Sequence, residues 1–408
     1  MDFDDTPEEA AWRAEVAAWM DRHAPLVEED HRRFDPFRDT SKEGERAHLA
    51  ASRRWQKMLY EGRWAGLTWP TLYGGRGLTS HHQGILNQEM ARYHVTVGAF
   101  AVSIGMVGPT LIAHGTDEQK QRYLDPMLRG DELWCQLFSE PGAGSDLASL
   151  RTRAERHGDE WVITGQKVWT SGAHVADHGI LLARTDADVP KHRGITYFIV
   201  DMSSPGVEVR PLRQIDGSAH FNEVFLTDVR IPDAHRVGEC GEGWRVAQTT
   251  LGAERTLIGG GQRLGFGEIV ELARNHDRTT DPVIRHDLVR CWSRYEIARF
   301  LRYRVQTAAS KGERPGPEAS VMKLALSRHL EANGDLVMAI EGPAALLYDR
   351  DAPDNGFWQI QFMGQWRSRI GGGTDQIQRN IVAERVLGLP PEPRPDKDMA
   401  FRELPTGT

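Results

Sequence analysis

The period of the hydrophobic pattern changes twice along the chain, and this change constrains the fold more than any other feature. Apolar residues recur at helical spacing up to about residue 133, at strand-like spacing from 134 to about 240, and at helical spacing again from 241 to 389. We therefore expect an α+β protein with several domains. The expected order is a helical N-terminal domain (1–133), a middle antiparallel β-barrel or sandwich (134–240), a C-terminal four-helix bundle (241–389) and an extended tail (390–408).

Two capping boxes mark helix starts in the first region. Thr6 with Glu9, and Thr116 with Gln119, each combine a hydroxyl with a side chain three residues later that can satisfy the first backbone N–H groups reciprocally. The helix behind the first box is expected to bury Trp12, Val16 and Trp19, and a second helix near 41–60 is expected to bury Leu49, Trp55, Met58 and Leu59.

Short β-rich segments follow one another in the second region, and long amphipathic segments in the third. The predicted strands are 160–164, 166–169, 179–183, 195–200 and 206–209, with Gly165 separating the first two. No helical segment of useful length lies between them, so we expect the strands to be antiparallel. The predicted helices of the third region are 242–275, 282–311, 317–341 and 374–388.

The charge balance excludes some classes of protein. There are 50 Lys and Arg residues against 58 Asp and Glu residues, a formal net charge of −8. An acidic chain lacks the broad basic surface that nucleic acids and anionic membranes require, although a local basic pocket for a phosphorylated ligand stays possible. The uncharged run 95–113 is poor in Leu and Ile, contains Gly98, Gly105, Gly108 and Pro109, and is flanked by histidines. We therefore expect a buried, interrupted helix there rather than a membrane span.

Cysteine usage and the first residues predict a cytoplasmic location. Cys135, Cys240 and Cys291 lie more than fifty residues apart and form no C-x-x-C pair, so neither a disulfide framework nor a cysteine zinc site is expected. The acidic start of the chain does not match a secretory signal. His174 and His178 have helical metal-pair spacing but lie in a loop-like segment without an evident third ligand, so we expect no metal.

Two segments of the middle region carry the chemistry. Residues 138–146 form a strand end followed by a turn of small residues, which is either a plain turn or a loop whose backbone amides and serines bind a ligand. The sequence GAGSDL at 142–147 is not a dinucleotide fingerprint, because it ends in leucine and lies outside a βαβ unit. Further along, Trp169 precedes Thr170 and Ser171; its indole would either lie in the core or edge a planar cofactor ring.

Together with the C-terminal segment 372–380 and its continuation 383–385, these motifs resemble those of the acyl-CoA dehydrogenase family. The resemblance begins at 67–70 and covers nearly the whole chain, with 139–146, 166–172 and 372–380 as its most specific parts. It implies the domain order predicted above, with FAD held between the β domain and the helical bundle. It also implies an acyl-CoA thioester beside the flavin and a homodimer or homotetramer.

The resemblance implies roles for individual residues at matching motif positions. Leu137 and Ser139 would face the pyrimidine side of the flavin, and Trp169 and Ser171 would lie near its reactive nitrogen, N5. The residues implied for FAD are Leu137, Ser139, Gly144, Ser145, Trp169, Ser171, Arg274, Thr374 and Gln376. The residues implied for the acyl-CoA are Ser145, Arg255 and Gly372.

The family's reaction requires a carboxylate that removes a proton from the carbon next to the thioester carbonyl. In many members this is a glutamate two residues before the threonine of the C-terminal motif, a position that Gly372 holds here. Isovaleryl- and long-chain-type enzymes carry it instead on the first long helix of the C-terminal domain, where this chain has Glu254. Glu254 shares a helical stripe with Ala247 and Leu251, which fits the base or, by spacing alone, a partly exposed glutamate paired with an arginine. In the family context we predict that Glu254 is the base and that the backbone N–H of Gly372 donates to the thioester carbonyl.

Two segments depart from the family's pattern. Arg274 lies where members have an arginine followed by a Phe-Gly pair that contacts the neighbouring subunit's FAD, but no such pair follows it here. Residues 341–344 replace a glycine-rich loop on the adenine side of FAD. We therefore expect the pyrophosphate and adenine contacts to differ from the usual ones.

The expected function is FAD-dependent dehydrogenation of an acyl-CoA to the trans-2-enoyl-CoA in fatty acid metabolism, with electrons passed to an electron-transfer flavoprotein. One alternative is an acyl-CoA oxidase or a flavin monooxygenase on the same fold. The other is a non-catalytic, acyl-CoA-binding subunit of a hetero-oligomer that depends on a partner's flavin. Against it argue the flavin and base residues present here, Ser139, Trp169, Ser171, Thr374 and Glu254.

Overall fold

The computed structural model describes residues 5–26, 42–96, 98–260, 265–310, 318–348 and 351–405. Two compact units divide the described chain at a point within one helix. The first contains the described residues up to Glu254 together with the tail from Pro393, and the second contains those from Arg255 to Glu392. The first unit combines helices with a sheet, whereas the second is helical.

The first unit begins with helices whose ends match the sequence signals. Thr6 and Glu9 form the first predicted capping box, with Glu9 N–H donating to Thr6 Oγ1 (3.3 Å) and Thr6 N–H donating to Glu9 Oε2 (2.7 Å). Thr116 and Gln119 form the second. Trp12, Val16 and Trp19 are buried as predicted. The α-helices are α1 (Pro7–His23), α2 (Lys42–Glu61), α3 (Ser80–Met90), α4 (Gly108–His114) and α5 (Asp117–Arg129).

The uncharged run 95–113 folds as short helical pieces. A π-helical turn (Ser103–Val107) leads directly into α4. Pro109 lies in the first turn of α4, where its lack of an N–H group is tolerated. Leu111 and Val107 are fully buried. Among the described helices, none is long and apolar enough to cross a membrane.

We expect Gly108→Ala to destabilise the first unit. A Cβ at Gly108 would lie 1.9 Å from Cζ2 of Trp69, whose indole is buried. The clash should lower the free energy of unfolding by about 3 kcal/mol, measured by denaturant unfolding. Gly84→Ala in α3 is the matched control, because nothing lies within 4 Å of the added carbon. It should leave stability unchanged or raise it by about 0.5–1 kcal/mol, and equal losses in the two variants would contradict the prediction.

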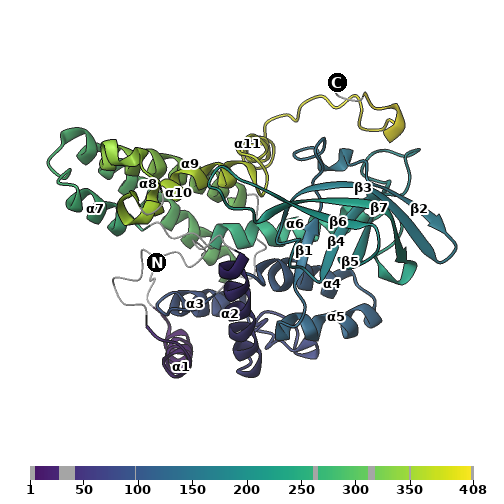
Figure 1. The fold of residues 1–408 in the computed structure, drawn as a ribbon, viewed down its shortest axis with the longest axis horizontal. Coiled ribbons are helices and arrows are strands. Elements are labelled where there is room, and N and C mark those ends of the chain that lie inside the picture. The colour runs from purple at the N-terminus through teal and green to yellow at the C-terminus, as the bar shows by residue number, and fades with distance from the viewer. Residues whose placement is uncertain are drawn as a thin grey trace. The chain divides into compact units, whose positions relative to one another are not determined.

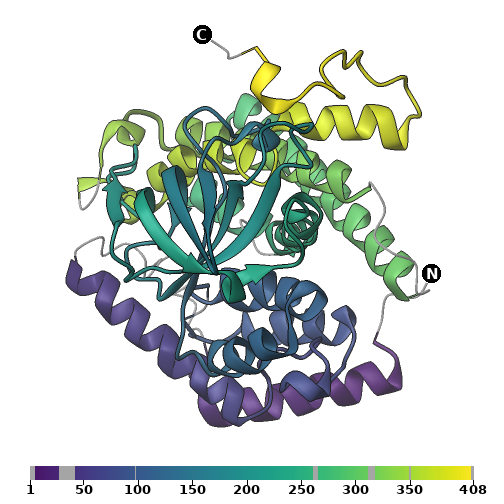
Figure 2. The same cartoon turned by 90° about the vertical axis from the view of Figure 1, so that its right-hand side faces the viewer.

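One mixed sheet forms the middle of the first unit, and in Figures 1 and 2 the helices α4 and α5 lie at one end of its strands. Its strands are β1 (Trp134–Leu137), β2 (Arg153–His157), β3 (Glu160–Ser171), β4 (His178–Arg184), β5 (Ile195–Asp201), β6 (Val207–Leu212), β7 (Phe221–Pro232) and β8 (Arg236–Val237). Their order is β6-β7-β3-β2-β4-β5-β8, with β1 also paired to β4. Side-chain amide protons of Gln119, at the start of α5, donate to the carbonyl oxygens of Ala234 and Arg236 and tie the helices to this sheet.

The prediction that all strands are antiparallel is wrong for β1, which runs parallel to β4 with Trp134 opposite His178 and Leu137 opposite Leu181. Parallel neighbours need a long crossover connection, and the sequence offered no helix for one. The crossover is instead made by the β2–β3 hairpin, which lies between β1 and β4 in the chain.

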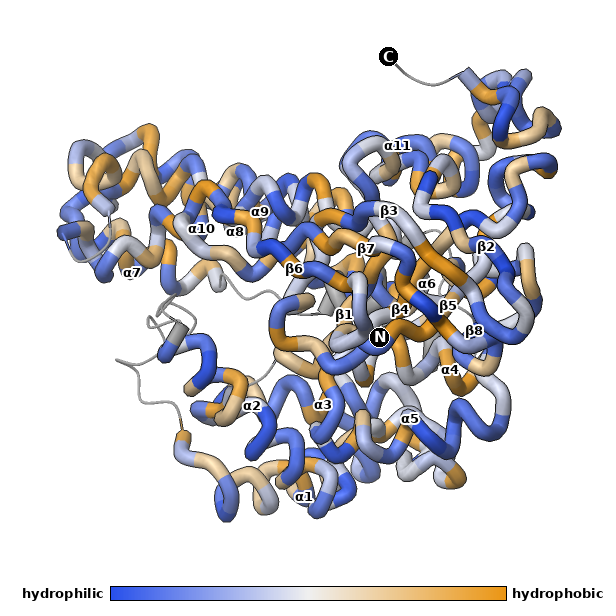
Figure 3. Tube along the Cα trace, turned by 45° about the vertical axis from the view of Figure 1, so that its right-hand side comes forward, coloured by the Kyte–Doolittle hydropathy of each residue, from blue (hydrophilic) through white to orange (hydrophobic). Residues whose placement is uncertain are grey.

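Strand β3 is continuous across Gly165, although the sequence predicted two segments there. A Cβ at Gly165 would lie 2.4 Å from Oγ1 of Thr152, so the glycine allows close approach of the preceding loop rather than a turn. The neighbouring strands β2 and β7 were not predicted, because their charged residues interrupt the apolar alternation. In Figure 3, β2 is mostly hydrophilic, whereas β4 and β5 contain runs of hydrophobic residues.

The tail, predicted from Pro390 onward as an extended coil, contains a turn at 395–398, and near its end it contacts the rest of the first unit. Phe401 N–H donates to the carbonyl oxygen of Val189 (2.9 Å), and the guanidinium of Arg184 lies 3.5 Å from the centre of the Phe401 ring. A short 3₁₀ helix (Phe401–Glu403) follows. This cation–π contact and the backbone bonds fix the tail to the loop between β4 and β5.

The helices of the second unit are only partly those expected. They continue from α6 (Gly243–Gly260) with α7 (Phe266–Asn275), α8 (Pro282–Ser310), α9 (Glu318–Glu341), α10 (Phe357–Ile370) and α11 (Asp375–Ile381), which leads into a π-helical turn (Val382–Val386). The predicted helix 242–275 is wrong, because Gly265 has an extended backbone that caps a separate α7. Helix α10 was missed, since its apolar residues do not gather on one face. Its Trp358 nevertheless belongs to the buried core of this unit, with Ile269, Cys291 and Val337.

Candidate active site

The loop 138–146 follows β1 and is a tight turn closed by its own backbone. The N–H of Glu140 donates to the carbonyl oxygen of Ala143 (3.1 Å), and the N–H of Ala143 donates back to that of Glu140 (3.0 Å). A Cβ at Gly142 or Gly144 would meet nothing within 4 Å. The turn therefore presents backbone to open space, as a loop that approaches a ligand closely must.

Trp169 lies in an irregular part of β3 that turns its indole out of the sheet. Lys167 pairs with Val224 and Thr170 pairs with Asn222, so two residues of β3 face one of β7 and form a bulge. Trp169 adopts φ +63°, a left-handed conformation that costs a residue with a Cβ about 1–3 kcal/mol. Its side chain is 61% exposed and contacts Phe221 only edge-on, which excludes the core interpretation and leaves an aromatic face available to a ligand.

The remaining predicted flavin residues of the first unit differ in accessibility. Ser145 and Ser171 are exposed and Ser139 is half-buried. Leu137, by contrast, is fully buried in the sheet core with Leu181 and Cys135. Only its backbone groups are available to face a flavin.

Two residues that the sequence interpretation passed over connect these segments. The buried Lys167 donates to the Glu140 carboxylate (2.8 Å), and the N–H of Val168 donates to the carbonyl oxygen of Ser139 (2.9 Å). The two predicted flavin motifs are therefore joined directly. The alternation of side chains along the strand could have revealed this pair. Lys167 lies on the same inward face of β3 as Trp161 and Ile163, which predicts that it is buried.

Glu254 continues the buried face of α6. Ala247 and Thr250 on this face are fully buried, and the Thr250 hydroxyl is hydrogen-bonded to Thr110 (2.9 Å) and to the Tyr197 hydroxyl (3.1 Å). Glu254 follows Thr250 by one helical turn and is half-buried. The structure thus holds this face of α6 firmly against the first unit and sets a carboxylate at the end of the packed stretch.

The C-terminal motif in the second unit is a glycine turn followed by α11. Gly372 and Gly373 have φ values of +62° and +84°, and their carbonyl oxygens accept from the side-chain amide of Gln378. Thr374 caps the helix, with its Oγ1 accepting from the N–H of Ile377 (3.2 Å), so the hydroxyl retains its own proton for a ligand. Gln376 is exposed on the first turn.

The two predicted arginines are less informative. Arg274 is exposed in the last turn of α7, where its charge also favours the helix C-terminus. The side chain of Arg255 lies outside the described residues. Leu137, Ser139, Gly144, Ser145, Trp169, Ser171 and Glu254 belong to the first unit, and Arg255, Arg274, Gly372, Thr374 and Gln376 belong to the second.

Comparison with known proteins identifies these segments. Family models of the acyl-CoA dehydrogenase N-terminal, middle and C-terminal domains match residues 6–131, 135–229 and 241–387. The chain belongs to the acyl-CoA dehydrogenase family. It is thus an enzyme of that family, with the family's fold of N-terminal helices, a central sheet and C-terminal helices.

Several actinobacterial relatives resemble this acyl-CoA dehydrogenase over most of its length. Acyl-CoA dehydrogenase IpdE1 of Mycobacterium tuberculosis is 42% identical over 347 residues, which is 83% of this chain and 88% of that protein. Acyl-CoA dehydrogenase FadE34 of the same organism is 43% identical over 327 residues, 79% of this chain but only 44% of FadE34. A solved structure entitled "Tcur3481-Tcur3483 steroid ACAD" has a TM-score of 0.82 at 32% identity, covering 96% of this chain and all of that one.

Acyl-CoA dehydrogenases use FAD, and the groups in this chain fit that cofactor. The open backbone at Gly142 and Gly144 leaves room for a ligand's polar atoms next to main-chain amides. Thr374 and Gln376 offer a hydroxyl and a carboxamide, and the exposed Trp169 offers a flat aromatic face. These groups are neutral and form hydrogen bonds, which suits the polar edge of the isoalloxazine ring and the phosphates of FAD.

The segment that we predicted to replace the family's adenine-side loop contains a buried carboxylate. Glu341, the last residue of α9, is 4% exposed, and its Oε2 accepts from the side-chain amide of Gln359 (2.6 Å). Burial, together with the nearby charge of Asp354, raises the pKa of Glu341 to about 7. The side chain therefore takes up a proton near neutral pH, unlike a glycine in that position.

Stability should consequently depend on pH through Glu341. Its folded pKa of about 7 exceeds the ordinary value of 4.5, so its contribution is fully present below about pH 4.5 and is lost as the pH rises through 7. We expect Glu341→Gln to melt at a higher temperature than the natural protein at pH 8 and at a similar temperature at pH 5. Glu392→Gln, in the exposed tail, should show no such trend. A pH-independent difference for Glu341→Gln would contradict the assignment.

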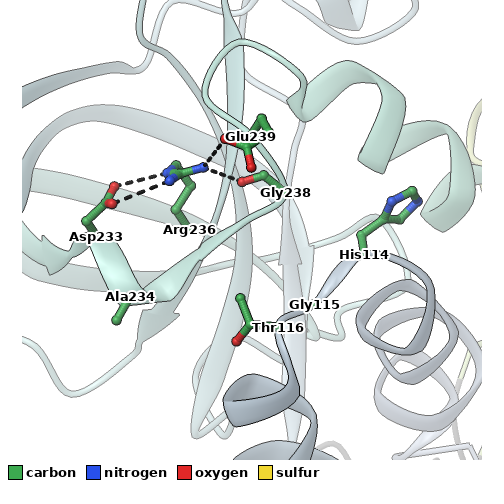
Figure 4. A pocket seen from close by; sticks show the side chains of 8 residues that line it. All are labelled: His114, Gly115, Thr116, Asp233, Ala234, Arg236, Gly238 and Glu239. Carbon is green, nitrogen blue, oxygen red and sulfur yellow. Dashed lines mark hydrogen bonds and ion pairs between the residues drawn. The ribbon is translucent and has the colours of Figure 1, made fainter.

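One pocket of the first unit does not involve the predicted site. It has a volume of about 330 Å³ and lies between the α4–α5 connection and the β7–β8 segment (Figure 4). Its lining residues are His114, Gly115, Thr116, Asp233, Ala234, Arg236, Gly238 and Glu239. Arg236 is already bound to the Asp233 carboxylate (Nε–Oδ1 3.0 Å) and to the carbonyl oxygen of Gly238. Since no residue predicted for FAD or acyl-CoA lines this pocket, the chemistry is not expected there.

Proposed function

We propose that this chain catalyses the FAD-dependent α,β-dehydrogenation of an acyl-CoA thioester to the trans-2-enoyl-CoA. The observation that carries the proposal is the half-buried Glu254, one turn beyond the buried Thr250 on the same face of α6. Its backbone is placed by the packed helical stripe that ends at Thr250, and a general base must be positioned in this way. Because Gly372 has no carboxylate, Glu254 is the residue to which we assign the proton transfer.

Each assigned residue has a defined part in the reaction. A carboxylate oxygen of Glu254 takes the proton from the α-carbon, and the backbone N–H of Gly372 donates to the thioester oxygen and stabilises the charge that develops there. Bound FAD supplies the acceptor for the hydride that leaves the β-carbon. Ser139, Ser171 and Trp169 would bind and orient the flavin ring. Thr374 and Gln376 would make further contacts with FAD.

The further assignments concern partners and substrate. We propose that the reduced flavin passes its electrons to an electron-transfer flavoprotein and that the reaction belongs to fatty acid metabolism. The proposed location is the cytoplasm, as predicted from the sequence. The similar solved structure is titled with two components and the word steroid. We infer from this likeness that a second, homologous subunit and a bulky polycyclic acyl group are candidates for this chain, beside a homo-oligomer and a simple acyl chain.

An anaerobic titration of the purified yellow protein tests the proposal. Straight-chain, branched and steroid-derived acyl-CoA thioesters are added in turn, and the flavin absorbance is followed. Bleaching by at least one of them supports dehydrogenation, and the concentration dependence ranks the acyl groups. Peroxide released in air, with no reduction of an artificial acceptor, would favour the oxidase or monooxygenase alternative. A colourless protein that binds acyl-CoA would favour the non-catalytic subunit.

A further inference from the structure

A buried ion pair joins the two segments to which flavin contacts are assigned. Lys167 is fully buried and donates from Nζ to Glu140 Oε1 (2.8 Å) and to the carbonyl oxygen of Phe138 (3.0 Å). Glu140, also buried, accepts in addition from the N–H groups of Arg151 (2.6 Å) and Thr152 (2.8 Å). The Lys167 ammonium group is therefore hydrogen-bonded to Phe138 and Glu140, the residues before and after Ser139.

The same connection continues through the backbone. The N–H of Val168 donates to the carbonyl oxygen of Ser139 (2.9 Å) and so does not pair with β7. On the other side of the bulge, the side-chain amide of Asn222 donates to the carbonyl oxygen of Thr170 (2.9 Å). Trp169 lies between these two anchored points and keeps its left-handed backbone. A strained conformation persists only where the surroundings hold it, and here they do so from both sides.

The charges in this pair are not explained by stability alone. Burial would raise the pKa of Glu140, but the Lys167 ammonium and the hydrogen bonds outweigh it, and the pKa is lowered. Burial lowers the pKa of Lys167 against the opposing effect of Glu140. Apolar replacements of buried ion pairs are often as stable as the pair itself. The presence of the pair is therefore better explained by its holding neighbouring segments in fixed positions than by a contribution to the free energy of folding.

We propose that Lys167 and Glu140 are a positioning pair that fixes Ser139 and the Trp169 bulge relative to each other, so that both present a preformed surface to the flavin. Lys167 is fully enclosed by protein and Glu140 is 8% exposed, so we assign neither residue a contact with the reacting atoms. The pair acts by holding the loop and the bulge in register before the cofactor binds, which reduces the ordering cost of binding. The inference rests on the flavin site assigned under the proposed function.

Three variants of the full chain test the pair: Lys167→Met, Glu140→Gln and the double variant, which replaces the charges by neutral groups of similar size. Hydrogen exchange is followed in peptides covering 138–146 and 166–172, together with FAD affinity and the melting temperature. We expect exchange in these two peptides to rise at least tenfold and FAD affinity to fall at least tenfold. The double variant should show both effects while melting close to the natural protein.

Arg230→Met is the matched control, because Arg230 on β7 pairs with Glu160 on β3 (3.2 Å) at the exposed surface of the same strands. Arg230→Met should change neither hydrogen exchange in the two peptides nor FAD affinity. Unchanged exchange in all three variants would overturn the proposal, and so would faster exchange with unchanged FAD affinity, since the pair would then be merely structural. If the natural protein bound no FAD, the proposed function would fail, while the exchange data would still decide whether the pair holds the loop and the bulge together. If Lys167→Met did not fold, Glu140→Gln would decide both points.

Discussion

Glu254→Gln is expected to leave FAD bound and to abolish bleaching of the flavin by acyl-CoA. Glutamine preserves the shape of the side chain and its place after the buried Thr250, but it cannot take up the α-proton. The rate of flavin reduction should fall by about 10²–10⁴-fold, the usual contribution of a positioned general base. Stopped-flow absorbance under anaerobic conditions measures this rate, and the visible spectrum reports FAD content.

Glu242→Gln is the matched control for the base. Glu242 precedes the same helix and is paired with Arg245 at the protein surface (2.7 Å), so its replacement makes the same change of charge nearby. It should leave flavin reduction unchanged. Glu254→Asp, with a shorter carboxylate, should retain part of the rate. Full bleaching by Glu254→Gln would remove Glu254 from the mechanism, whereas loss of FAD from that variant would show a structural role.

Asp375→Asn is expected to destabilise the second unit and release FAD. Asp375 is 2% exposed, and its Oδ1 accepts from the Ser327 hydroxyl (2.6 Å) and lies 3.5 Å from Lys323 Nζ. Lys323 is itself 4% exposed, so the variant leaves a buried ammonium without its counter-charge. Removing one partner of such a pair costs about 3–5 kcal/mol. Thr374 and Gln376 flank Asp375, so their presentation to FAD should suffer with it.

Thermal unfolding and FAD content together measure this effect. We expect the melting temperature to fall by about 10 °C and the purified variant to be largely colourless. Adding Lys323→Met to Asp375→Asn should recover much of the stability, because Lys323 is the most buried of the three cations near Asp375, and the other two, Arg328 and Arg369, are more exposed. Asp335→Asn, on the exposed face of α9, should change neither property. A single variant that is as stable and as yellow as the natural protein would contradict the role given to Asp375.

Several predictions made from local patterns were confirmed. The capping boxes at Thr6 and Thr116 were confirmed, because a cap depends only on residues three positions apart. The helices predicted at 282–311 and 317–341 end close to the observed α8 and α9. The family assignment was confirmed as well, since its motifs are continuous segments. The roles of individual site residues stay predictions.

Predictions that needed contacts between distant residues were wrong or absent. The parallel pairing of β1 with β4 joins residues more than forty positions apart, such as Trp134 and His178, and no local pattern encodes such a pairing. Helix α10 was missed because its burial depends on α9 packing against it rather than on one apolar stripe. The choice for Trp169 between core and exposed ligand face was likewise left open by its neighbours in the sequence.

The sequence by itself therefore determined the order of helical and β regions, the helix starts, the family and the absence of a carboxylate at position 372, each of which depends on residue type or near neighbours. The tertiary structure alone decided that Lys167 meets Glu140, that the bulge turns Trp169 outward, and that the face of α6 leading to Glu254 is buried. These outcomes depend on which segments pack together in space, because burial and ion pairing are set by neighbours far away in the chain.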